Sequence, residues 1–154
     1  MQYVKELQNE LVNAIKVGSY TKHPSEVFRD FIPQHEGDNQ PFVCVVNPAS
    51  VEDSKVARCS SWMKSVELRV LVRDFVPVRG DLDVADGQEA EVDVLLTVCQ
   101  EIKDHIRANY YQLTAGGISF VLDDIVHDPL YDYSLLLESS SFISSLSFTY
   151  KGMV

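Results

Sequence analysis

An acidic stretch of the chain, DLDVADGQEAEV at residues 81–92, has the composition of a calcium-binding loop. Such a loop needs oxygen ligands at positions 1, 3 and 5, glycine at position 6 and a bidentate glutamate at position 12. Counted from Asp81, Asp83 falls at position 3, but position 5 is Ala85 and the glycine comes one position late. Position 12 is Val92, which cannot bind a cation. The spacing therefore argues against calcium at this stretch.

The same residues can instead start a helix. Asp86 is a good N-cap residue, and Glu89 follows three positions later, which is the spacing of a capping box. The carboxylates near this point would also interact favourably with the helix dipole. We therefore predict a helix over residues 88–110, with Arg79-Gly80-Asp81 as a turn before it.

A second acidic group, Asp123, Asp124 and Asp128, could form an acid pair or clamp a divalent cation. However, Asp123 and Asp124 point to opposite faces if the apolar strand before them continues. We therefore favour a solvated strand end over a metal site.

Histidines give no stronger sign of catalysis. His23, His35, His105 and His127 occupy four different segments, and no two of them have metal-ligand spacing. His105 is near the end of the predicted 88–110 helix, where a cation interacts well with the dipole. The chain also lacks a GxSxG elbow and a phosphate-binding loop. We predict no catalytic residue, no bound metal and no cofactor, and the sequence assigns no role to the histidines.

A small set of predicted helices and strands would position these candidate residues. Val4, Leu7, Leu11 and Ile15 recur at helical spacing in residues 2–17, and a similar stripe recurs in the 88–110 helix. The expected strands and β-rich regions are residues 26–32, 42–46, 62–75, 118–126 and 131–150, with a bend or bulge at the serines 139–141. Residues 47–61 are polar, and we interpret them as a hairpin tip, an extended hairpin or a mobile loop.

Residues 62–75, WMKSVELRVLVRDF, show the clearest alternation of apolar and polar side chains. One face of this strand should cover a core and the other should meet solvent or a partner. Trp62 and Met63, at its head, fit either the core or an interface equally well. The candidate contacts with another subunit or partner are Trp62, Met63, Lys64, Glu67, Arg69 and Arg73.

Composition and charge set the broad class. The 154 residues suit one domain spanning 1–154, and no apolar run is long enough to predict a membrane span. The N-terminal residues do not form a signal peptide, and three cysteines without metal spacing suggest a reducing, intracellular setting. Residues 1–73 carry no net charge, so the formal charge of −10 belongs to residues 74–154. An excess of acid in one half disfavours a protein that grips DNA.

Strands separated by single helices predict an α+β fold, with two main helices packed on an antiparallel or mixed sheet. The order of elements resembles the tail terminator (tail completion) proteins of tailed bacteriophages. The resemblance rests on the strand PFVCVV, the alternating strand VELRVLVRD, the helix QEAEVDVLLTVCQEIKDHI and the final LSFTYKG. Proteins of this family form a ring, typically a hexamer, that caps the tail tube and joins it to the head.

The resemblance implies a structural virion protein of the phage tail or neck, assembled in the host cytoplasm and lacking catalytic residues. Its partners would be copies of itself, the tail tube protein and the head-tail connector protein, with DNA only passing through the lumen and no membrane contact. Residues 47–61 would form a hairpin extending from the core.

An acidic lumen would let DNA slide without binding. We therefore expect either residues 81–86 or residues 123–132 to face the channel, and the candidate carboxylates are Asp81, Asp83, Asp86, Asp123, Asp124 and Asp128. Three alternatives remain: another connector, head-closure or tube subunit of a phage, a monomeric adaptor, and a small acidic enzyme or divalent-metal-binding module.

Overall fold

The computed structural model describes residues 2–29, 42–55, 62–77 and 84–153, without the side chains of residues 84–87. These residues form a single α+β domain, as the sequence predicts. The helices are α1 (Gln2–Lys16), α2 (Val84–Asn109) and α3 (Tyr133–Ser139). The strands are β1 (Glu26–Arg29), β2 (Val43–Lys55), β3 (Trp62–Phe75), β4 (Gln112–Ala115), β5 (Ile118–His127) and β6 (Ser141–Met153).

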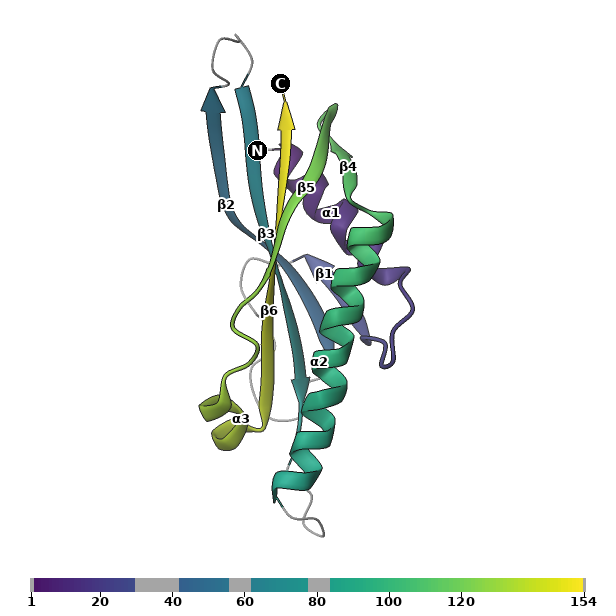
Figure 1. Ribbon diagram of the computed structural model, residues 1–154, viewed down its shortest axis with the longest axis vertical. Coiled ribbons are helices and arrows are strands. Elements are labelled where there is room, and N and C mark those ends of the chain that lie inside the picture. The colour runs from purple at the N-terminus through teal and green to yellow at the C-terminus, as the bar shows by residue number, and fades with distance from the viewer. Residues whose placement is uncertain (1, 30–41, 56–61, 78–83, 154) are drawn as a thin grey trace.

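The six strands form one mixed sheet in the order β1-β2-β3-β6-β5-β4. Only β1 and β2 pair in parallel, and the other neighbours are antiparallel. Figure 1 shows a strongly twisted sheet with α1 and α2 on one face. The molecule is elongated: the β2–β3 hairpin extends at one end, and α3 lies toward the other.

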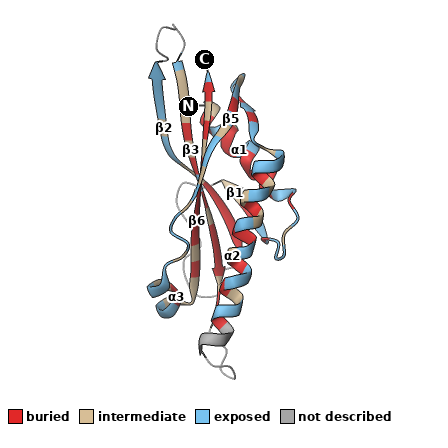
Figure 2. Ribbon diagram, in the orientation of Figure 1, coloured by how far each residue is buried: buried red, intermediate tan, exposed pale blue. Residues whose placement is uncertain are grey.

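The core lies between this sheet face and the two long helices (Figure 2). The predicted stripes of both helices are buried, including Leu7 and Leu11 on α1 and Ile102 and Ile106 on α2. Alternate residues of β3 and β6 complete the core: Val66, Leu68, Val70, Val72, Leu146, Phe148 and Tyr150, each of them 0% exposed. Periodicity of 3.6 in the helices and 2 in the strands thus identified the buried faces correctly.

Strand β2 is longer than the sequence suggests. We expected the apolar strand to end at Asn47-Pro48, but β2 continues to Lys55 and pairs with β3 as far as Trp62. The register shifts between Pro48 and Ser50, and such a bulge accommodates a proline that cannot donate to the ladder. The extended-hairpin interpretation of residues 47–61 is therefore correct for residues 47–55, whereas residues 56–61 lie outside the described chain.

Helix α2 begins at Val84, so Asp86 occupies the first turn and is not the N-cap residue. The predicted capping box between Asp86 and Glu89 is therefore wrong in its register. Helix ends are the least certain part of any pattern-based prediction, because the apolar stripe does not mark them.

The region predicted as β-rich, residues 131–150, contains the short helix α3 before β6 begins. The side chain of Asp132 caps this helix by accepting a hydrogen bond from the Leu135 amide at 3.1 Å. Ser140 has a φ of 55° and closes the helix in the left-handed conformation. The serine cluster therefore marks a helix-to-strand junction. Of the two predicted alternatives, a bend or a bulge, the bulge is wrong, because β6 pairs with β3 from Ser141 onward without a shift in register.

Strand β4 was not predicted from the sequence. It forms a tight hairpin with β5 through Gly116 and Gly117, whose φ angles of 57° and 74° favour glycine. No helix in the described part of the chain is both long enough and apolar enough to span a membrane.

Candidate functional site

The structure separates the predicted acidic residues. Asp81 and Asp83 lie outside the described residues, and the side chain of Asp86 is not described. Asp123 and Asp124 are exposed at the margin of the sheet, where a register shift interrupts the pairing of β5 with β6. Asp128 is also exposed, just beyond the end of β5.

Asp123 and Asp124 do not share a partner. Asp123 Oδ2 lies 3.1 Å from Lys151 Nζ, whereas Asp124 Oδ1 accepts a hydrogen bond from the Ile125 amide at 2.9 Å. Among the described residues, no three histidine, cysteine or acidic side chains are grouped closely enough to hold a metal ion. Asp123 and Asp124 therefore do not form an acid pair, and both are exposed to solvent at the margin of the sheet.

The histidines that the structure describes make separate local contacts. His105 Nε2 lies 2.8 Å from the Ala14 carbonyl oxygen. Because this oxygen can only accept, Nε2 donates the hydrogen bond, which links α2 to α1. His23 Nε2 lies 3.2 Å from the Gly18 carbonyl in the segment after α1. His105 therefore joins α2 to α1, whereas its place near the helix end had suggested only a favourable interaction with the helix dipole. His35 lies outside the described residues.

One polar cluster could be mistaken for a nucleophile and its base. His127 Nε2 hydrogen-bonds to the Ser144 hydroxyl, and the Ser144 side chain also interacts with the Cys99 thiol. Burial lowers the pKa of His127, with the nearby Lys103 charge as a further cause, and burial raises the pKa of Cys99 to about 11. Ser144 and Cys99 are both 0% exposed, so no substrate reaches them in this conformation.

Sequence analysis missed this cluster because its members belong to three elements that meet only in the folded sheet. Leu146 is the partner of His127 in the β5–β6 register, which brings Ser144 within reach of the imidazole. The hydrogen bond between His127 and Ser144 satisfies the buried hydroxyl and links β5 to β6.

The interface residues predicted on β3 fall on two faces of the sheet. Met63, Glu67 and Arg69 point away from the helices, while Trp62 and Lys64 lie on the helix side. Trp62 is 47% exposed and so is not a core residue. The alternation separates even from odd positions, but it could not show that Trp62 and Lys64, on the core-facing side, lie beyond the core that begins at Val66.

The predicted interface residues on the two faces of β3 have different partners within the chain. Glu67 accepts a hydrogen bond from the Ser50 hydroxyl at 3.2 Å and lies 3.9 Å from Arg69. Lys64 Nζ lies 3.1 Å from Asp53 Oδ1 and 5.1 Å from the centre of the Tyr3 ring. The hydrogen bond to Asp53 raises the pKa of Lys64. Arg73 is only 7% exposed, so the monomer does not present it as a contact residue.

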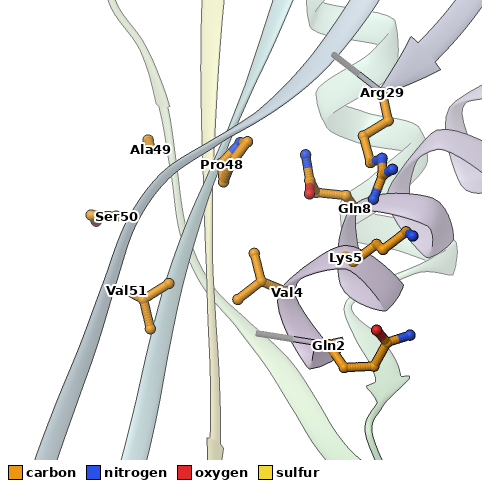
Figure 3. A pocket seen from close by; sticks show the side chains of 9 residues that line it. All are labelled: Gln2, Val4, Lys5, Gln8, Arg29, Pro48, Ala49, Ser50 and Val51. Carbon is orange, nitrogen blue, oxygen red and sulfur yellow. The ribbon is translucent and has the colours of Figure 1, made fainter. Parts of the chain in front are cut away.

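A groove of about 640 Å³ lies between α1 and the edge of β2, where no candidate residue was predicted (Figure 3). Its apolar part is formed by Val4, Pro48 and Val51, and Val4 faces Val51 across the gap. Its polar lining residues are Gln2, Lys5, Gln8, Arg29 and Ser50, and Ala49 completes the set.

Gln8 positions the two walls of this groove. Its side chain is 1% exposed, and Nε2 donates a hydrogen bond to the Val46 carbonyl at 3.2 Å. The last described residue of β1, Arg29, lies opposite Val46, and none of the described strands pairs with the outer edge of residues 47–55. The groove therefore runs beside residues 48–51 of β2. Its only sequence signal was a glutamine within the apolar stripe of α1.

The chain matches no protein-family model, and no curated protein matches it in sequence.

Proposed function

We propose that the protein is a structural ring subunit of a bacteriophage neck that terminates the tail tube and joins the tail to the head. The extended hairpin supports this proposal, because the resemblance to tail terminator proteins led us to expect an extension at this position. Residues 47–55 of β2 form one arm of that hairpin and β3 forms the other.

The observation that carries the proposal is the exposure of this arm in the isolated chain. Ala49, Ser50 and residues 52–55 are all exposed, on both faces of the strand, and Val51 is only half-buried. A strand that buries so little gains almost nothing from hydrophobic packing within its own chain. An assembly in which this arm contacts a neighbour accounts for its exposure in the isolated chain.

In this proposal the subunit has no cofactor and catalyses no reaction, and its mechanism is assembly. Free subunits dock on the last ring of the tail tube, prevent addition of further tube subunits and present a new surface to the head-tail connector. Two different faces of one chain meet in such a ring, so the contact is heterologous. A ring of acidic side chains around the lumen keeps the passing DNA from binding.

Binding to tail tubes tests the proposal. The purified protein is mixed with tail tubes of a phage that encodes it, and the mixture is imaged by negative-stain electron microscopy. We expect rings at one end of each tube and no binding along its length. A protein that leaves both ends bare at saturating concentration is not a tail terminator. A ring that forms but binds only to isolated connectors would instead favour a head-closure role.

A further inference from the structure

The short helix α3 and the residues before it expose large apolar side chains to solvent. Leu130, Tyr133 and Leu137 are each at least 50% exposed, and we call these three residues the α3 patch. Tyr133 and Leu137 are four positions apart, which places them on one face of the helix. Leu136 is the one buried residue of α3. A seven-residue helix is not stable by itself in water, so a partner that covers the α3 patch would stabilise it.

The α3 patch lies in an acidic part of the chain. Residues 108–150 contain no lysine and no arginine. Asp128, Asp132 and Glu138 are close to the patch along the chain, and all three are exposed. A partner that suits this surface therefore combines an apolar side chain with a positive charge.

The end of the β2–β3 hairpin offers a surface of this kind. Trp62 begins β3 and lies opposite Lys55, the last residue of β2. Directly opposite residues of an antiparallel pair project from the same face, so the indole and the ammonium group belong to one surface. Trp62 is 47% exposed, and Lys55 is exposed as well. Tryptophan is enriched among the residues that dominate binding energy at protein interfaces.

We propose that Trp62 and Lys55 of one copy dock on the α3 patch of a second copy, with Trp62 against Tyr133 and Leu137 and with Lys55 near Glu138. This inference rests on the proposed ring and identifies where the hairpin arm of one subunit contacts its neighbour. Burial of the indole on the apolar patch supplies the affinity. The attraction between Lys55 and Glu138 fixes the orientation.

The positions of the two surfaces determine what this contact builds. The hairpin extends at one end of the elongated molecule, and α3 lies toward the other end (Figure 1). One copy therefore places its hairpin on one neighbour and offers its α3 patch to another. Such a contact is heterologous and repeats from copy to copy, as a ring requires. Two α3 patches placed against each other would instead bring carboxylates together.

Two variants each remove one side of the contact. Leu137→Gln keeps the indole but has a polar α3 patch, whereas Trp62→Gln keeps the patch. Each should require at least about tenfold more protein than the wild type to assemble in sedimentation velocity. Tyr133→Gln should behave like Leu137→Gln, and Val94→Gln, on the exposed side of α2, is the matched control. All four side chains are at least 37% exposed, so circular dichroism and thermal unfolding should match the wild type.

Mixing the two variants isolates the proposed contact. The chain has a single tryptophan, so the fluorescence of the mixture comes only from Trp62 of Leu137→Gln. This indole can bind the intact α3 patch of Trp62→Gln, and the other two surfaces of the pair are the altered ones. We therefore expect a complex of about twice the monomer mass of 17.4 kDa. The emission should shift to shorter wavelength and saturate as Trp62→Gln is added, because the indole leaves water. A double variant with both substitutions, added instead of Trp62→Gln, should leave the emission unchanged.

The possible results separate this inference from the proposed function. If the wild type forms rings without a shift in emission, or Leu137→Gln assembles as well as the wild type, the contact is wrong and the ring stands. If the emission shifts in wild-type rings but not in the mixture, a different surface covers Trp62, and the inference also fails. A shift that needs added tail tubes identifies the tube as the partner of Trp62 and overturns the contact. If the wild type is monomeric at every concentration, the ring and this contact both fail.

Discussion

Replacing Gln8 by leucine tests whether the buried contact between α1 and β2 holds the groove together. Leucine is close to glutamine in size but cannot donate a hydrogen bond, so the Val46 carbonyl loses the donor now 3.2 Å away. Gln8 is 1% exposed, and water cannot take over this bond without opening the interface. A buried acceptor that loses its partner costs about 1–3 kcal/mol.

For a chain of this length, a loss of 1 kcal/mol lowers Tm by about 2–4 °C. We therefore expect Gln8→Leu to lower Tm by about 2–12 °C, with a matching decrease in the urea midpoint and no change in the slope of the transition. The control is Asn13→Leu, an exposed position on the same helix, which should change the free energy of unfolding by less than about 0.5 kcal/mol.

Calorimetry and urea unfolding measure both variants under identical conditions. A Gln8→Leu protein as stable as the wild type, or more stable, would refute the reasoning, since the apolar side chain would then replace the hydrogen bond without loss. An equal decrease in the Asn13→Leu control would show that leucine on α1 is harmful for some other reason. Only a selective decrease assigns the effect to the bond with Val46.

Four further outcomes follow from the structure. Gly152→Val should lower stability by about 1–3 kcal/mol in urea unfolding, because a Cβ there would lie 2.7 Å from Ile118 Cγ2; Thr114→Val, at an exposed position, is the control. In a Cys59→Ser background, iodoacetamide should alkylate Cys44 and Cys99 only after urea is added, since both thiols are buried and burial raises their pKa values; rapid labelling of the native protein would contradict this. Because the folded pKa of His127 is lowered, the unfolded chain binds its proton more readily, and stability falls as the pH drops through about 6.5. His127→Gln should therefore lose less stability than the wild type between about pH 7 and pH 5, and equal losses would show that another group titrates. Excess Ca²⁺ or Mg²⁺ should leave Tm unchanged, whereas a saturable increase would favour the metal-binding alternative.

Patterns of burial explain which parts of the fold could be predicted. Leu7, Leu11, Ile102 and Leu68 belong to stripes with a single period, and hydrophobic burial dominates the energy of such elements. Residues 48–55 have no apolar face, so their sequence looked like a loop. Their strand conformation comes from pairing with β3, which no local pattern records.

The candidate site was even less accessible from the sequence. Lys5, Arg29 and Val51 lie on three elements and meet only because β2 continues past its bulge beside α1. Asp123 and Asp124 were identified as acidic candidates, but the shift in register that exposes both at the sheet margin depends on pairing with β6. Tertiary pairing thus supplied the information that spacing along the chain lacked.

The mass of the protein in solution tests the central claim most directly. Sedimentation velocity or native mass spectrometry of the wild type, with negative-stain images of the same sample, distinguishes a closed ring from a monomer of 17.4 kDa. The account predicts one closed species, about six times the monomer mass if the ring is a hexamer, with a central hole. A particle that stays at 17.4 kDa at high protein concentration, and also in the presence of tail tubes, would contradict it.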